Sequence, residues 1–162
     1  MSRPTAAFAR AYWDAGWQLH IHVNGDAALD LVLDTIDDCM AAVRAASVLN
    51  RKIPLSLHSD LPMGPAAPLA LASFAVNRRT PSGRIAGPEQ RISVHDALRA
   101  VTIEAAYSWR MEHELGSITA GKAATFTVLA EDPYEVDPGR LGDIAILGTV
   151  YQGRWFPVAV SG

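Results

Sequence analysis

The sequence predicts an α/β fold with a smaller β-rich region at its C-terminal end. Residues 17–23 alternate and are rich in strand formers, whereas residues 26–43 place apolar side chains at helical spacing. Residues 53–58 again have the composition of a strand. A strand, a helix and a strand in this order indicate a parallel unit with the helix as a right-handed crossover. After Gly116 the pattern changes to short apolar runs separated by turns.

Turn residues and helix caps place the elements that follow. Residues 59–68 and 78–92 are rich in Pro and Gly and predict loops, with a helix at 68–77 between them. Ser93 is followed three residues later by an aspartate, an arrangement that resembles a capping box with Asp in place of Glu. It predicts a helix that continues to about Tyr107.

The tail predicts three short strands, within 123–130, 143–150 and 153–158. We therefore expect two regions. Residues 1–115 form the α/β part, and residues 116–162 form a β-rich module that packs on it.

Composition limits the classes of partner. The chain has 162 residues, of which 49% are hydrophobic and 19% charged, and its net charge is −3, as expected for a globular core. Without a basic run or a basic amphipathic helix, neither nucleic acid nor a membrane surface is expected as a partner. Cys39 stands alone, and no signal-peptide pattern is visible at the N-terminus, so we expect a cytoplasmic location.

Two pairs of potential metal ligands end the predicted strands. His20 and His22 are two residues apart, as are His58 and Asp60, so each pair shares one face of a strand. Parallel strands place such ends at one edge, where α/β folds build their sites. Imidazole and carboxylate groups suit a catalytic zinc ion, although a histidine at a strand end is also a common structural hydrogen-bonding residue.

The other candidates have simpler interpretations. His95 lies in the first turn of a predicted helix and is expected to be exposed. His113 lies in a polar stretch between two glutamates, and Cys39 is interpreted as a packing residue.

Several motifs in order carry a resemblance to the amidohydrolase superfamily. The chain resembles its amidohydrolase family 3 branch, which includes N-substituted formamide deformylase-like enzymes. The matching stretches are His22-Val-Asn-Gly-Asp26, His58-Ser-Asp60-Leu-Pro62-Met, Gly116-Ser-Ile-Thr-Ala-Gly121-Lys122, Asp132-Pro133 and Gly148-Thr-Val-Tyr-Gln-Gly153-Arg154.

The resemblance implies the (β/α)₈ barrel of a metal-dependent hydrolase, flanked by a small β-sandwich. It also implies one or two divalent metal ions, with zinc expected, and hydrolysis of an amide-like or formamide-like C–N bond in a small molecule through a metal-activated water. By position, His22 matches a metal ligand. Asp60 matches the aspartate that binds metal and transfers protons, and His58 is expected to contact the substrate. His20 does not match a ligand position.

Departures from the family pattern shape the expectation. The family's early His-x-His pair, a bridging Lys and a later His are absent, and Thr125 replaces a usual Asp. Only about ten residues separate the helix near Met40 from Ile53, too few for a strand–helix crossover. We therefore expect a C-terminal portion with an internal segment missing.

Two protein ligands are fewer than the three of a catalytic zinc site. His20 or His58 could complete the site, or a symmetric partner could supply a ligand, and unpaired strand edges also favour a homo-oligomer. The alternative function is a non-catalytic truncated remnant or interaction module of the family.

Overall fold

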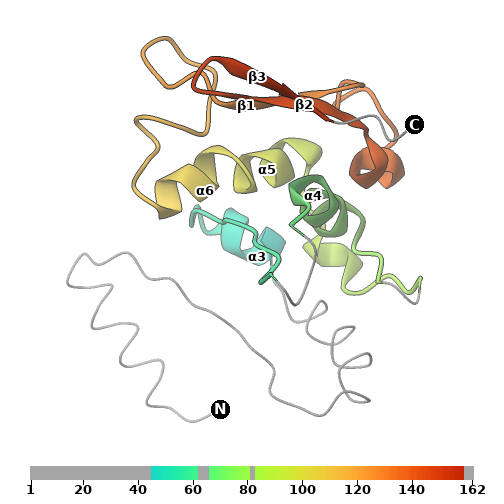
Figure 1. The fold of residues 1–162 in the computed structure, drawn as a ribbon. Helices are drawn as coiled ribbons and strands as arrows, with labels where there is room; N and C mark the ends of the chain where they lie inside the picture. Colours follow the sequence, from blue (N-terminus) through green and yellow to red (C-terminus); the bar gives the residue numbers. More distant parts are fainter. Residues whose placement is uncertain (1–44, 62–65, 81–82, 159–162) are drawn as a thin grey trace, which may run out of the picture.

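Residues 45–61, 66–80 and 83–158 are described by a computed structural model. The sheet lies over helices α4, α5 and α6, and α3 lies on the other side of these helices (Figure 1). In chain order the elements are α3 (Ala45–Asn50), α4 (Pro68–Asn77), the 3₁₀ helix η1 (Pro88–Gln90), α5 (Val94–Ala100), α6 (Ile103–Ser108), β1 (Phe126–Leu129), the 3₁₀ helix η2 (Pro138–Asp143), β2 (Ile146–Tyr151) and β3 (Arg154–Pro157).

Helix α4 confirms the prediction for residues 68–77 at both ends. Pro68 occupies the first turn, where its missing N–H costs nothing. Arg78 ends the helix in the left-handed conformation, with φ of 56°, and its N–H donates to the carbonyl of Phe74. The Arg78 side chain is buried and donates from Nε to the carbonyl of Ala86 at 2.8 Å. This burial lowers the pKa of the Arg78 guanidinium, and the charge of Glu89 opposes the shift.

Ser93 begins α5 as predicted, since its Oγ accepts the N–H of Asp96 at 3.0 Å. The single helix predicted up to Tyr107 is instead broken between α5 and α6. Thr102 adopts a non-helical conformation there, and its hydroxyl donates to the carbonyl of Leu98 at 2.7 Å. A threonine that bonds back to the preceding turn tends to bend a helix, which accounts for the break.

The sheet is antiparallel in the order β1-β2-β3. It confirms the three strands predicted in the tail, with two of them shorter than their predicted ranges and β2 running one residue further. Thr127 faces Thr149, and an irregularity after Val128 brings Leu129 opposite Ile146. Because cross-strand partners share a face, these four side chains lie on one side of the sheet.

The hydrophobic core joins the helices to the C-terminal region. Ala72 of α4 and Leu141 of η2 are fully buried in the same cluster. Asn77, at the end of α4, donates from Nδ2 to the carbonyl of Pro138 at 2.7 Å. The tail therefore packs on the α-helical part through η2.

The segment 53–58 differs from its predicted strand. It pairs with no strand among the described residues. Leu55 and Leu57 pack against the core, and the Leu57 N–H donates to the carbonyl of Ala100 at 3.1 Å. The strand composition alone was not sufficient, because sheet formation also requires a neighbouring strand.

Some predicted elements lie outside the described residues. These are the strand at 17–23 and the helix at 26–43, so the parallel arrangement stays a prediction. Helix α3 lies where the sequence suggested only a connection. Within the part of the chain that the structure covers, no helix is both long and apolar enough to cross a membrane.

Candidate functional site

His58 and Asp60 are brought together by a tight turn at the end of the extended segment. Asp60 adopts the left-handed conformation, with φ of 53°, so the strand alternation expected between the two residues does not reach it. Instead, the backbone N–H of Asp60 donates to Nδ1 of His58 at 3.2 Å. The two residues are therefore held by a local turn, and the prediction that they share one face of a strand is wrong.

This hydrogen bond determines how the His58 ring can act. Because Nδ1 accepts, the neutral ring carries its proton on Nε2, which is then a donor. In this tautomer Nε2 has no lone pair to offer a metal ion. The geometry therefore favours His58 as a hydrogen-bond donor over His58 as a third metal ligand.

A small cavity opens beside His58. We call it the His58 cavity; its volume is about 220 Å³. It is lined by His58, Ser59 and hydrophobic side chains from the extended segment, from the start of α4 and from residues that flank α4 and α5: Leu57, Ala66, Ala67, Pro68, Leu71 and Val101.

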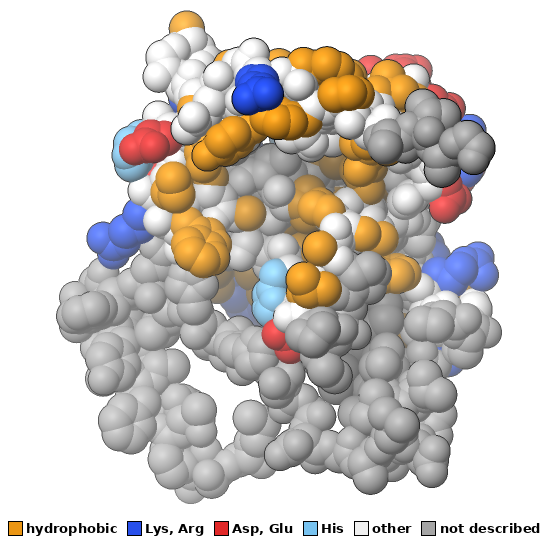
Figure 2. Space-filling view, in the orientation of Figure 1, with side chains coloured by type: hydrophobic (Ala, Val, Ile, Leu, Met, Phe, Trp, Pro, Cys, Tyr) orange, Lys and Arg blue, Asp and Glu red, His pale blue; other side chains and the backbone are white. Residues whose placement is uncertain are grey.

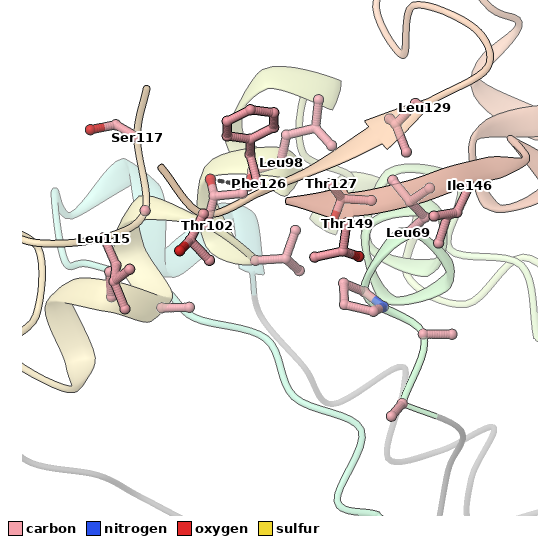
Figure 3. A pocket seen from close by; sticks show the side chains of 18 of the residues that line it. Leu69, Leu98, Thr102, Leu115, Ser117, Phe126, Thr127, Leu129, Ile146 and Thr149 are labelled. Atoms are coloured by element: carbon pink, nitrogen blue, oxygen red, sulfur yellow. Dashed lines mark hydrogen bonds between the residues drawn. The ribbon is translucent and has the colours of Figure 1, made fainter. Parts of the chain in front are cut away.

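A larger cleft lies between the sheet and the helices. This sheet–helix cleft has a volume of about 750 Å³. Figure 2 shows a hollow beneath the sheet with hydrophobic side chains around it. Thr127 and Thr149 come from the sheet, while Leu69 of α4 and Leu98 of α5 come from the helices (Figure 3). The cleft was not predicted, although the alternation of Thr125, Thr127 and Leu129 could have indicated that one face of the tail is inward.

The remaining candidates are placed as follows. His20, His22 and Cys39 lie outside the described residues. His95 is exposed, as predicted, and its Nδ1 lies 3.2 Å from the hydroxyl oxygen of Tyr134. His113 is also exposed and lies 3.4 Å from a carboxylate oxygen of Glu114.

Of the two expected metal ligands, only Asp60 lies among the described residues. The Asp60 carboxylate has the right chemistry for a divalent ion. Among the described residues, however, no three His, Cys, Asp or Glu side chains cluster so that they could hold a metal. The donors present in this part therefore fit a zinc ion in kind but not in number.

Residues 40–156 match the sequence model of the amidohydrolase family. This match covers most of the chain, and the chain belongs to that family. The resemblance seen in its motifs is confirmed.

Three curated proteins from different organisms are similar to the chain. N-substituted formamide deformylase of Arthrobacter pascens is 36% identical over 107 residues, which cover 66% of this chain and 20% of the relative. Protein LONG AFTER FAR-RED 3 of Arabidopsis thaliana is 37% identical over 128 residues, covering 73% and 22%. A protein of Bacillus subtilis (strain 168) whose name describes it as an amidohydrolase, YtcJ, is 32% identical over 111 residues, covering 67% and 21%.

The chain thus spans about a fifth of the length of the curated relatives it matches. No solved structure matches it significantly.

Proposed function

We propose that this chain forms part of a metal-dependent hydrolase that cleaves C–N bonds in small amide-like or formamide-like molecules. The family match carries this proposal, because the matched residues 40–156 include His58 and Asp60. The name of the Arthrobacter pascens relative, an N-substituted formamide deformylase, supports the same class of bond.

The metal ligands in this proposal are His22 and Asp60, with zinc as the ion and further donors from outside the described residues. A bound ion of this kind supplies a water molecule whose pKa is lowered to about 7. Of the two proposed ligands, Asp60 is the one that lies among the described residues.

The chain's own residues would divide the remaining work. Nε2–H of His58 would donate to the carbonyl oxygen of the substrate and orient it. The Asp60 carboxylate would take a proton from the attacking water and deliver it to the leaving nitrogen. The water oxygen bonds to the carbonyl carbon and the C–N bond breaks, so a formamide yields formate and an amine.

The wider setting of the site is also proposed. Family membership supports a (β/α)₈ barrel with a small β-sandwich, to which residues 116–162 would contribute. We propose a homo-oligomer in the cytoplasm, with a small-molecule substrate and neither nucleic acid nor a membrane as partner.

The test is hydrolysis of a panel of N-acyl and N-formyl amines by the full chain, with zinc or manganese added. We expect release of amine that depends on metal and falls sharply in His22→Ala and Asp60→Ala. Bound metal, measured by elemental analysis, should fall in the same variants. Metal below stoichiometric levels that neither substitution changes, together with no amine release, would reject the proposal.

The alternative is a non-catalytic truncated remnant or interaction module of the family. Exposed apolar side chains favour it, since Trp109 is 77% exposed and Ile118 is 86% exposed. Apolar groups of this kind at a surface can mark an interface. A folded chain that binds a protein partner and hydrolyses no member of the panel would select this alternative.

A further inference from the structure

The sheet–helix cleft and the His58 cavity are adjacent. Ala66, Ala67, Pro68 and Val101 line both of them. A molecule held at His58 therefore meets the cleft directly across the start of α4. The larger space extends away from the predicted chemistry, as a binding space for the rest of a substrate would.

The lining of the cleft selects for a neutral ligand. None of the described residues that line it has an ionisable side chain. Its polar groups are hydroxyls and one indole N–H, and three of the hydroxyls already have partners, among them that of Ser117. Thr102 donates to the carbonyl of Leu98, and Thr125 accepts the N–H of Gln152 at 3.2 Å. A charged group would lose its hydration here without an opposite charge to replace it.

The size of the cleft suits an organic substituent. Its volume of about 750 Å³ lies within the range of small-molecule sites, about 300–1,000 Å³. Apolar side chains from both walls, such as Leu69, Leu98, Leu129 and Ile146, would surround an alkyl or aryl group. Each methylene buried there should tighten binding about fourfold.

We propose that the sheet–helix cleft binds the large apolar substituent of a neutral amide whose carbonyl lies at His58. The inference rests on the proposed function for the reaction, and it names the substrate class as amides with a bulky hydrophobic group. The C-terminal sheet thus forms one wall of the substrate site.

Thr127 provides the sharpest test of this assignment. It is exposed, it lies on the cleft face of β1, and it pairs across the sheet with Thr149. Thr127→Trp would fill the cleft, and Thr127→Val would keep its shape. Arg154→Trp places the same indole on β3, where it does not line the cleft, and serves as the matched control.

The experiment is calorimetric titration of the full chain with N-hexylformamide and N-methylformamide. We expect N-hexylformamide to bind at least tenfold more tightly. Thr127→Trp should remove that preference, whereas Thr127→Val and Arg154→Trp should retain it. Circular dichroism confirms folding of each variant. If Thr127→Trp does not fold, Thr149→Trp fills the cleft from β2.

Each outcome separates the two proposals. Equal binding of the two formamides, or a preference that a folded cleft-filling variant retains, would overturn the cleft assignment. A change in oligomeric state with no change in formamide binding would also overturn it, because the cleft would then be an interface between copies. Chain-length-dependent binding without hydrolysis of either probe would keep the cleft and reject only the proposed reaction.

Discussion

Gly116 lies directly against Ala106 of α6. A Cβ atom at position 116 would be 2.7 Å from the Ala106 Cβ and 2.8 Å from the Cα of Ile103. Gly116 also has φ of +82°, a backbone conformation that residues with a side chain rarely adopt. The first glycine of the Gly116–Lys122 stretch is therefore required twice, for its conformation and for the close approach to α6.

Gly116→Ala should lower the free energy of unfolding by about 3 kcal/mol, from backbone strain and overpacking together. Gly121→Ala is the matched control, because Gly121 has φ of +93° and a Cβ atom added there would meet nothing within 4 Å. It should lose only about 1 kcal/mol. Urea titration measures both, and equal losses would show that the contact with α6 contributes nothing.

Asp60→Asn separates the chemistry of Asp60 from its conformation. Asparagine tolerates the left-handed conformation that Asp60 adopts, so the turn should be kept. If the proposed function holds, amine release should fall by about 100-fold or more, because the proton acceptor is lost. The measurement is the hydrolysis rate beside a thermal melt. An unchanged rate in a folded variant would remove Asp60 from the mechanism.

Leu141→Ala tests the shared core. Leu141 is fully buried between η2 and α4, and its truncation should cost about 2–5 kcal/mol of unfolding free energy. Leu147→Ala removes the same atoms from a side chain that is 50% exposed and should cost less than about 1 kcal/mol. Chemical denaturation measures the unfolding free energy of both variants. Similar losses in the two would show that Leu141 does not belong to the core.

Local signals predicted the elements that depend on nearby residues. The helix at 68–77 and the Ser93 cap depend on neighbouring residues, and both were placed correctly. The strands of the tail followed from short apolar runs between turns. The end of α5 was missed because a hydroxyl-to-carbonyl bond from Thr102 outweighs an otherwise continuous helical pattern.

Features that depend on distant residues could not be predicted in the same way. The extended segment at 53–58 has the composition of a strand, yet its partner must come from elsewhere in a fold. The sheet–helix cleft exists only where the tail meets α4 and α5, which no local pattern encodes. For the site, the strand face that His58 and Asp60 were expected to share is not formed, because Asp60 adopts a left-handed turn conformation.

Self-association is expected from the sheet. Among the described residues, β1 and β3 each have one strand neighbour, so each leaves an edge. Light scattering at micromolar concentration should give a mass of at least a dimer. Phe156 is exposed on β3, and Phe156→Lys should shift the mass toward that of the monomer. A monomer for the unsubstituted chain would contradict this prediction.

The packing of η2 on α4 also bears on how this family member can be recombined. Leu141 packs in the same core as residues of the helices. The change of sequence pattern near Gly116 therefore does not separate two independent cores. Residues 116–162 therefore cannot be exchanged between relatives as a unit that folds independently. A chimera joined at that point would have to carry α4 along with its 3₁₀ partner.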